Sequence, residues 1–484
     1  AQTLNQLSGV ATAPAYERSA LRRSIVHIGV GGFHRAHLAT YIDELAAAGS
    51  TAWAITGAGV MPSDAAMAEA LSSQDYLYTL VSRSPDITEV WIIGSIVGFV
   101  LAYDDPTGFL QLIASPDTQI VSMTVTEGGY PVDDITGEFI PAQCPTGSTF
   151  ELLARGLDER RTNASMTGAV APLTVMSCDN IMTNGAVARA ATIGAAARLN
   201  DDLVEWVNEH VSFPNSMVDR ITPVTTPQDI AWLESEMGIS DRWPVFAEPF
   251  RQWVVEDNFA GDRLPLEQLD VIITSDIEPY ELTKLRLLNA GHSCLAYLAS
   301  LDGHAAVDTA MADPALRRFV ETLLHHEAKA TLPTAAGIDL DDYIAALIDR
   351  FSNPMVGDQI ARLCLDGTAK FPKFLVPTIR AQIAGDQHVA LSALALAGWC
   401  EYLRGDNLSS DPQLDAAVEH AQRSVDEPEA FLDFVEIFGD DLRNSTVFVE
   451  AFTSALSLLR TVGVQSAIAA VLQRTAHPND HHTS

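Results

Sequence analysis

A lysine, an asparagine and a histidine occur at close spacing within one apolar stretch near the middle of the chain. Lys284, Asn289 and His292 follow the pattern K-x4-N-x2-H, and Glu281 lies three residues before the lysine. On a helix that turns about 100° per residue, Glu281 and His292 fall within about 80° of the lysine, and the asparagine at about 140°. Burial lowers the pKa of a lysine and lets it serve as a general base near neutral pH. The spacing therefore predicts a proton-transfer site on one side of a helix.

The same residues have a purely structural interpretation, in which Lys284 extends to solvent and His292 is an ordinary helix residue. The pattern alone does not separate the two interpretations. A straight helix would place these two side chains about 12 Å apart along its axis. A shared substrate would then require the long lysine side chain or a bend, for which Gly291 is the nearest candidate.

A second segment, near the N-terminus, has the residue types of a dinucleotide-binding turn. The apolar run 25–28 is followed by Gly29, Gly31 and Gly32 and then by a helix-like segment. Such glycines let the backbone approach a pyrophosphate, whose charge is favoured at a helix N-terminus. The match to G-x-G-x-x-G is partial, because His34 occupies the third glycine position. A tight structural turn is the alternative interpretation.

The elements that must position these residues change in type along the chain. Strand-like runs occur at 25–28, 53–56, 91–97, 120–126, 173–176 and 271–274, with helical patterns between them. This alternation predicts a doubly wound parallel sheet of Rossmann type. Beyond about residue 281, helical patterns occur at 290–301, 316–328, 340–350, 356–365, 389–403, 431–439 and 447–461. We therefore expect an α/β, dinucleotide-binding Rossmann-type domain over 1–280 and a mainly α-helical domain over 281–484, which would carry the substrate and catalytic residues of the lysine segment.

The composition is that of an acidic globular protein. The 484 residues include 63 acids and 29 bases, a net charge of −34, and 47% are hydrophobic. This charge disfavours nucleic acid and acidic membranes as partners, so we expect a small-molecule partner. The five cysteines lack paired metal-ligand spacing, which argues against a structural zinc and predicts no metal site.

The cysteines and the apolar runs also predict the cellular compartment. Scattered cysteines suit reduced thiols in a cytoplasm. The first 23 residues lack the apolar core of a secretory signal, and the apolar run 389–399 is too short to span a bilayer. We therefore expect a cytoplasmic protein in which the run 389–399 is a buried helix.

Several motifs resemble, in their order along the chain, those of the polyol-specific long-chain dehydrogenases/reductases, and among them the bacterial mannitol 2-dehydrogenases. The resemblance extends from about residue 24 to residue 460. Besides the lysine segment, it includes HIGVGGFHRAH at 27–37, TEGGY at 126–130, SCDN at 177–180, FPNSMVDRITP at 213–223, EPF at 248–250 and DGTAKFPKF at 366–374.

This resemblance implies a metal-independent, NAD-dependent oxidation of a secondary alcohol, foremost D-mannitol to D-fructose and the reverse. It makes Lys284 the general base, and Asn180 and Asn289 the amide donors that stabilise the alkoxide. By the same resemblance, His292 donates to a substrate hydroxyl or holds the lysine. Glu281 then relays the proton of the base to solvent.

The resemblance also assigns substrate contacts to Asp219, Arg362 and Lys370. An uncharged polyol needs several directed donors and acceptors, which these residue types supply. Each has a structural alternative. Asp219 could form a surface pair with Arg220, Arg362 could be a charge on a helix face, and Lys370 a loop lysine.

Residues expected around the cofactor come from several motifs. Asp64 follows the second predicted strand and is expected against the ribose hydroxyls. Ser63 stands where the family counterpart has a second acid, which weakens rejection of a 2′-phosphate. No lysine or arginine lies between residues 47 and 76, so NAD is still expected. The full set is Gly29, Gly31, Gly32, Phe33, Asp64, Thr126 and Glu127.

Four other functions are compatible with parts of the pattern. Tyr280 and Lys284 reproduce the Y-x3-K pair of short-chain dehydrogenases, although they lie about 250 residues after the glycines. Within the resembling family, a fructuronate or tagaturonate reductase would use Arg362 or Lys370 as a carboxylate clamp. Arabinitol and sorbitol dehydrogenases would differ only in pocket shape. A non-enzymatic sugar-sensing or scaffold protein would have lost the lysine constellation. The resemblance implies a monomer.

Overall fold

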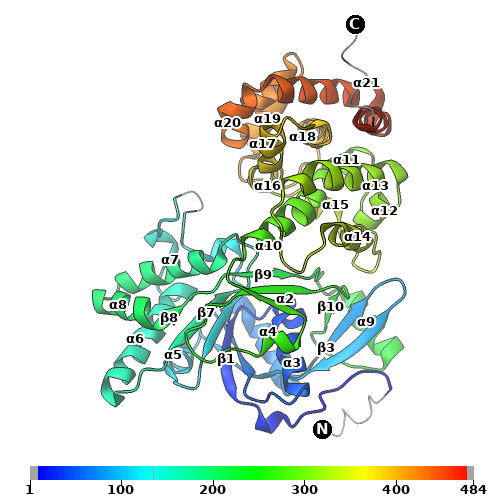
Figure 1. The fold of residues 1–484 in the computed structure, drawn as a ribbon. Helices are drawn as coiled ribbons and strands as arrows, with labels where there is room; N and C mark the ends of the chain where they lie inside the picture. The colour runs from blue at the N-terminus through cyan, green and yellow to red at the C-terminus, as the bar shows by residue number, and fades with distance from the viewer. Residues whose placement is uncertain (1–8, 134–135, 477–484) are drawn as a thin grey trace. The chain divides into compact units, whose positions relative to one another are not determined.

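Two units make up the chain, Ala1–Glu278 and Pro279–Ser484, in a computed structural model that describes residues 9–133 and 136–476. Within those described residues, every named strand lies in the N-terminal unit, and the C-terminal unit is built from helices (Figure 1).

A six-stranded sheet forms the centre of the N-terminal unit. Its order is β5-β2-β1-β6-β7-β8, and all five neighbouring pairs run parallel. The strand order reverses between β1 and β6, which is where open α/β sheets bind ligands at the carboxyl ends of their strands. The predicted doubly wound sheet is confirmed. The strands are β1 (Arg23–Ile28), β2 (Ala54–Gly59), β5 (Ile96–Leu101), β6 (Ile120–Met123), β7 (Leu173–Ser177) and β8 (Val211–Ser212).

Helices cover both faces of this sheet because successive side chains of each strand point to opposite faces. Ile25 belongs to one apolar core with α3 (Leu38–Ala47) and α4 (Ala65–Ser73). Val26 belongs to a second core on the other face. The helices of that second core are α5 (Pro106–Ala114), α6 (Thr149–Thr167), α7 (Asn184–Ala197) and α8 (Asp201–His210).

The run 91–97, predicted as a single strand, is divided between two sheets. The chain breaks at Gly94, where an added Cβ would lie 3.0 Å from Pro14 and whose N–H donates to Asp43 at 2.7 Å. Residues before the break form β4 (Thr88–Ile93), which pairs with β3 (Tyr78–Arg83) in a sheet with β10 (Val245–Ala247). Residues after the break form β5 of the main sheet. A third sheet, also not predicted, contains β9 (Ser216–Asp219), β11 (Gln252–Glu256) and β12 (Val271–Thr274).

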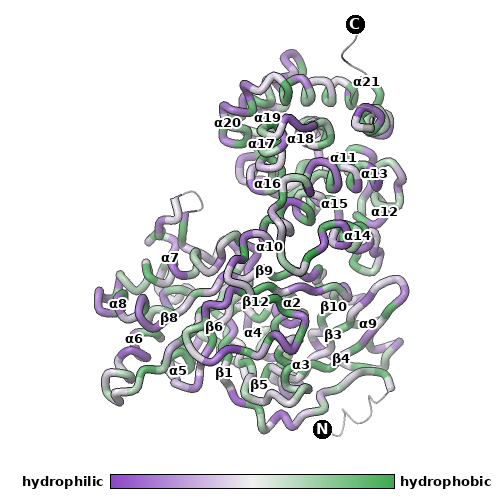
Figure 2. The backbone as a smooth tube through the Cα atoms, in the orientation of Figure 1, coloured by the Kyte–Doolittle hydropathy of each residue, from purple (hydrophilic) through white to green (hydrophobic). Residues whose placement is uncertain are grey.

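The C-terminal unit packs its helices around α18 (Ala390–Tyr402), in which Leu391 to Cys400 are all buried. The predicted buried helix is therefore confirmed. Along the other helices of this unit, hydrophilic and hydrophobic residues alternate every few positions (Figure 2). They include α11 (Ala290–Leu301), α13 (Pro314–Leu323), α14 (Leu340–Phe351), α16 (Gly367–Phe374), α17 (Val376–Ala384), α19 (Leu414–Arg423), α20 (Val435–Arg443) and α21 (Thr446–Ala476).

Three helical predictions in this unit differ from the structure. The run 356–365 was too long and forms only α15 (Ile360–Leu363). The run 316–328 is helical throughout but changes from α13 to a π-helical turn at Leu324–Ala328, and 431–439 is divided between a 3₁₀ helix (Pro428–Asp433) and α20. By length and composition α21 could cross a membrane. However, its backbone leaves the helical conformation at Gly463, and Phe452 and Ile468 lie in the core of the unit. A buried core helix meets the same criterion.

Candidate active site

The glycine turn after β1 has one position that only glycine can occupy. Gly29 has φ +87°, and an added Cβ would lie 2.2 Å from the carbonyl oxygen of Thr124. At Gly31 the nearest atom to an added Cβ is 3.9 Å away, so packing alone would admit a side chain there. The turn leads into α2 (Gly32–Ala36) at the reversal point of the sheet. This geometry fits a backbone that a pyrophosphate approaches closely.

His34 explains how the turn works without the third glycine of the motif. Its ring is 1% exposed and stacks on the ring of His27, with centroids 3.5 Å apart and planes 10° from parallel. A flat side chain on β1 thus meets a flat side chain on α2. Burial lowers the pKa of His27 to about 3 and that of His34 well below its usual range, so both rings are neutral. Neither ring nitrogen of His34 has a hydrogen-bond partner among the described residues.

Asp64 lies against the carboxyl end of β2. An added Cβ on Gly59, the last residue of that strand, would lie 2.5 Å from the Cβ of Asp64. Glycine therefore lets the acid approach the strand end. The carboxylate accepts a hydrogen bond from the N–H of Met61 at 2.9 Å and is half-buried. This is the place where NAD-binding sheets carry an acid for the ribose hydroxyls.

A pocket of about 390 Å³ is lined by Thr126, Glu127, Gly128, Asp179 and Asn180, at the carboxyl ends of β6 and β7. It brings together three predicted site residues from two separate motifs. Asp179, a residue of the SCDN motif for which no role was predicted, is buried in its wall. Burial raises the pKa of Asp179 above its usual range, and the hydrogen bonds that it accepts oppose that rise.

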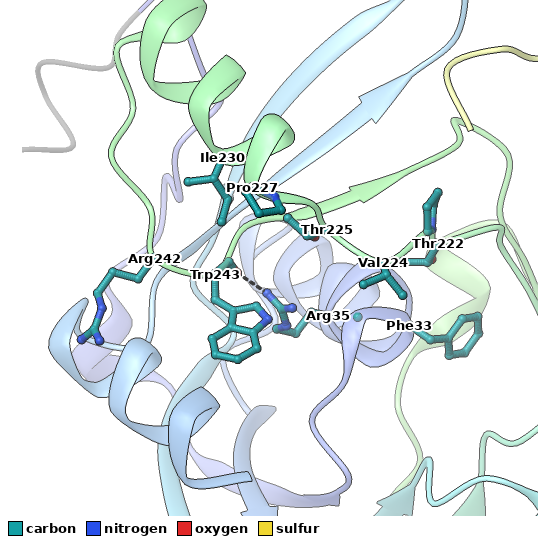
Figure 3. A pocket seen from close by; sticks show the side chains of 11 residues that line it. Phe33, Arg35, Thr222, Val224, Thr225, Pro227, Ile230, Arg242 and Trp243 are labelled. Atoms are coloured by element: carbon teal, nitrogen blue, oxygen red, sulfur yellow. Dashed lines mark hydrogen bonds between the residues drawn. The ribbon is translucent and has the colours of Figure 1, made fainter. Parts of the chain in front are cut away.

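A second pocket, of about 420 Å³, lies beside α2 and is lined by Gly32 and Phe33 (Figure 3). The buried Arg35 reaches across to donate a hydrogen bond to the carbonyl of Trp243, drawn as a dashed line. The predicted cofactor residues are thus divided, with Gly32 and Phe33 at this pocket and Thr126 at the other.

Asp219 occupies the last position of β9, where it pairs with Gln252 of β11. Asp219 is 4% exposed and Arg220 is 7% exposed. The guanidinium of Arg220 donates to the carbonyl of Glu248 at 3.0 Å and to that of Ala36. The alternative of a surface pair is therefore wrong.

In the C-terminal unit, the lysine segment is a π-helical turn, Lys284–Asn289, between α10 (Glu278–Thr283) and α11. An i→i+5 turn places residue i+5 above residue i. Asn289 therefore lies on the side of Lys284, where a straight α-helix would separate them by about 140°. The irregularity expected at Gly291 occurs one turn earlier, and Gly291 itself lies within regular α11.

Burial distinguishes the two interpretations of this segment. Lys284 is 7% exposed and Glu281 is 4% exposed, so the interpretation of a lysine extending to solvent is wrong. The Nδ2 atom of Asn289 is buried and has no hydrogen-bond partner among the described residues. Buried amide donors are seldom left without an acceptor, so Nδ2 is available to donate to a bound group. His292 is half-buried and stacks on Phe351, with centroids 4.0 Å apart.

The two remaining predicted residues lie on neighbouring short helices. Arg362 is exposed and forms a two-pronged ion pair with Asp358, Nε to Oδ1 at 2.7 Å and Nη2 to Oδ2 at 2.5 Å. The hydrogen bond to Asp358 raises the pKa of Arg362. Lys370 donates from Nζ to the carbonyl of Leu363 at 3.2 Å, next in sequence to Arg362. The two cations are therefore brought to one end of α15.

One group of side chains in the C-terminal unit has metal-ligating types. Ligand atoms of Asp302, His304 and Asp313 lie within 4.8 Å of one another. The amide of Gln465 donates to both carboxylates, at 2.6 Å and 3.1 Å. None of these residues belongs to the predicted site.

Comparison with protein families identifies the two units. A Mannitol dehydrogenase Rossmann domain matches residues 23–268, and a Mannitol dehydrogenase C-terminal domain matches residues 276–460. The chain belongs to the mannitol dehydrogenase family. The predicted family and the predicted pairing of a Rossmann domain with a helical domain are confirmed.

Relatives match over almost the whole chain. Mannitol 2-dehydrogenase of Phaeosphaeria nodorum is 39% identical, over 97% of this chain and 84% of that protein. The Aspergillus fumigatus mannitol 2-dehydrogenase is also 39% identical, over 94% of each. The structure resembles Pseudomonas fluorescens mannitol 2-dehydrogenase in a ternary complex with NAD and D-mannitol, with TM-score 0.85 and 40% identity over 98% of this chain and 99% of that chain. A D-sorbitol dehydrogenase structure gives TM-score 0.88 and 34% identity over 96% and 99%.

Membership of the mannitol dehydrogenase family excludes the short-chain alternative. Tyr280 is 3% exposed, and its hydroxyl donates to the carbonyl of Ala336 at 2.8 Å. That contact gives the tyrosine a structural explanation. The Y-x3-K spacing with Lys284 is a coincidence.

Proposed function

We propose that this chain catalyses the NAD-dependent oxidation of D-mannitol at C2 to D-fructose, and the reverse reduction. The observation that carries the proposal is the π-helical turn, which holds the buried Lys284 and the buried amide of Asn289 on one side. Relatives that are mannitol 2-dehydrogenases, 39% identical over nearly the whole chain, supply the substrate class.

Oxidation of a secondary alcohol requires removal of the hydroxyl proton as the carbon loses hydride. NAD, when bound, accepts that hydride. Lys284, which is 7% exposed, takes the proton as general base. The amides of Asn180 and Asn289 donate hydrogen bonds to the oxygen as negative charge develops on it, a contribution typically worth about 3 kcal/mol per donor.

The neighbouring side chains have supporting roles in this proposal. Glu281, one turn before Lys284, passes the proton from the lysine to solvent. His292, whose ring plane is set by stacking on Phe351, donates to a substrate hydroxyl or holds the lysine. Neither side chain removes the proton of the C2 hydroxyl itself. We therefore expect substitution of Glu281 or His292 to lower kcat less than substitution of Lys284.

Recognition of the polyol chain is assigned to Asp219, Arg362 and Lys370. Asp219 supplies an acceptor from the end of β9, and the two cations supply donors from one end of α15. The pairing with Asp358 leaves Arg362 neutralised, which favours an uncharged polyol over a uronate.

The glycine turn and its neighbours fit NAD. Gly29 cannot carry a Cβ, Gly31 leaves an open face, and Asp64 lies at the end of β2. We propose that Gly32 and Phe33 complete the pyrophosphate side, and Thr126 and Glu127 the nicotinamide side. We further propose a cytoplasmic monomer that needs no metal and binds neither nucleic acid nor membrane.

The test is NADH oxidation by the purified protein with EDTA present, using fructose, sorbose, xylulose, fructuronate and tagaturonate in parallel. We expect fast fructose reduction that EDTA does not slow, and a single monomer peak by size-exclusion chromatography with light scattering. Lys284→Ala should lower kcat by about 10²-fold or more and leave NADH affinity unchanged.

Lys329→Ala is the matched control, because that lysine is half-buried, is paired with Asp341 at 2.5 Å and belongs to no predicted site. It should retain wild-type kcat. Activity confined to the two uronates would replace the proposal with a hexuronate reductase. Normal turnover by Lys284→Ala would remove the lysine from its assigned role.

A further inference from the structure

The wall of the 390 Å³ pocket contains a buried carboxylate with no assigned function. Asp179 is 8% exposed and follows the end of β7. One carboxylate oxygen accepts the N–H of Thr126 at 2.9 Å. The other accepts the N–H of Val125 at 3.0 Å and the hydroxyl of Tyr130 at 2.7 Å. A single side chain on the β7 loop thus holds two consecutive backbone amides of the β6 loop.

The held segment has a backbone that its residues do not favour. Thr126 has φ +63° and ψ 167°, a region that is almost confined to glycine, and threonine is β-branched. Such a conformation persists only where surrounding contacts enforce it. The hydrogen bonds that the N–H groups of Val125 and Thr126 donate to the Asp179 carboxylate are such contacts.

Other hydrogen bonds fix Asp179 itself. Its carbonyl accepts Nδ2 of Asn184 at 3.0 Å, and that amide also donates to the carbonyl of Ser216 at 2.7 Å. The hydroxyl of Tyr130 also contacts Oγ of Ser177 at 2.6 Å. These hydrogen bonds fix the backbone of Asp179, so its carboxylate can hold the β6 loop in place.

The position of the pocket indicates which part of a ligand it receives. The sheet has two halves, β5-β2-β1 and β6-β7-β8, and dinucleotides bind with one mononucleotide on each. Asp64 marks the first half as the adenosine side. The pocket at the ends of β6 and β7 then receives the nicotinamide side.

We propose that Asp179 is a positioning residue that shapes the pocket for the nicotinamide half of the cofactor. It holds the backbone of Thr126, and it fixes Asn180, which is the next residue in the chain. The inference rests on the proposed function for the identity of the cofactor. It adds a residue whose effect is exerted through others, since the hydrogen bonds of its carboxylate all go to protein groups of the β6 loop.

The test compares Asp179→Asn with Asp241→Asn. Asp241 is also a buried carboxylate of the N-terminal unit that accepts two backbone N–H groups, from Thr79 and Trp243, but it does not line the pocket. Binding of NADH and of ADP-ribose is measured for both variants and the wild type. ADP-ribose lacks nicotinamide, so it reports the adenosine side alone.

We expect Asp179→Asn to weaken NADH binding tenfold or more and to leave ADP-ribose binding within twofold. An asparagine presents an NH₂ group to one of the two backbone N–H donors, so one hydrogen bond is lost and the loop relaxes. In turnover, kcat should fall more than KM for mannitol rises. Asp241→Asn should leave both affinities and kcat unchanged, even where it lowers the melting temperature equally.

Unchanged NADH affinity in a folded Asp179→Asn protein would overturn the inference, as would an equal loss of NADH and ADP-ribose binding. If Asp179→Asn does not fold, Tyr130→Phe decides, because it removes one hydrogen bond to the carboxylate and keeps the ring. Threefold weaker NADH binding with unchanged ADP-ribose binding supports the inference, and no change refutes it. A wild type that binds NADH but oxidises no polyol would refute the proposed substrate only.

Discussion

At the scale of single residues, a buried hydrogen-bond donor without an acceptor indicates a binding role. The buried Nδ2 of Asn289 is the clearest case, because it has no hydrogen-bond partner among the described residues. Leaving such a donor without an acceptor costs about 1–3 kcal/mol. A side chain that only supported the fold would have no reason to carry this cost. If Nδ2 donates to a substrate oxygen, that cost is recovered, because the hydrogen bond forms when the substrate binds.

Asn289→Ala should therefore separate stability from activity. We expect kcat to fall about 10²- to 10³-fold, the usual effect of removing a donor to a developing oxyanion. The melting temperature should stay unchanged or rise, because an unsatisfied amide is removed. Activity assays and thermal unfolding of the same preparation check both expectations. A large loss of stability with unchanged kcat would assign Asn289 to the fold.

Among single residues, the sequence was enough to choose candidate site residues by type and motif, but it did not predict their contacts. Lys284 and Asn180 could be chosen because their types and motifs fit alcohol oxidation. Asp179 could not, although it lies in the same SCDN motif, because its importance depends on which amides of another loop it reaches. The pairing of Arg362 with Asp358 could have been predicted, because opposite charges four residues apart on a helix lie side by side.

Among the elements, the β1–α2 turn shows how local backbone geometry divides two roles between neighbouring glycines. Gly29 needs a positive φ and a close approach to Thr124, whereas Gly31 has room for a methyl group. The first glycine therefore serves the fold. The second has open space beside it, where we propose that the cofactor binds.

Gly29→Ala and Gly31→Ala should accordingly fail in different ways. In Gly29→Ala the Cβ meets a backbone oxygen at 2.2 Å, so we expect a loss of stability above about 2 kcal/mol. Gly31→Ala should unfold within about 0.5 kcal/mol of the wild type and bind NADH at least tenfold more weakly. Denaturant unfolding and fluorescence titration measure the two effects. Equal stability of the two variants would contradict the assignment.

Elements with strong periodicity could be predicted, and those set by tertiary contacts could not. Helix α11 and strand β12 fall where their apolar patterns predicted. The break between β4 and β5 is a property of Gly94 and its packing against Pro14, 80 residues earlier in the chain. The π-helical turn Lys284–Asn289 could not be recognised in the sequence, because apolar residues occupy most positions in and after it and leave no single apolar stripe whose phase would show an additional residue.

For the whole molecule, buried ionisable groups give the two units opposite responses to acid. In the N-terminal unit, burial lowers the pKa of His27 and of His37 to about 3. The unfolded chain binds a proton at each near pH 6.5, so acidification favours unfolding. The C-terminal unit contains Glu327, whose pKa burial raises to about 7. It holds a proton that the unfolded chain releases near pH 4.5, so acidification favours folding.

Between pH 7 and pH 5, we therefore expect the N-terminal unit to lose stability, by up to about 1.4 kcal/mol per histidine and pH unit. Over the same range Glu327 should stabilise the C-terminal unit. Hydrogen exchange followed by mass spectrometry measures protection in β1 and β6 against protection in α18. His27→Gln should reduce the acid loss in the first set only. Parallel loss of protection in both units would show that other groups dominate.

The π-helical turn also makes the site depend on the length of the chain as well as on its residues. Five positions separate Lys284 from Asn289, a spacing out of phase with an α-helix and in phase with an i→i+5 turn. Deleting one residue between them would restore a regular α-helix in which they are four residues apart, about 40° round the axis and still on one side. The present five-residue spacing keeps them together only because the backbone widens to an i→i+5 turn at this point. If the same residues formed a regular α-helix, every proposed catalytic side chain would be present, yet the amide would lie about 140° round the axis from the lysine. A comparison of residue identities alone would overlook this dependence on the backbone.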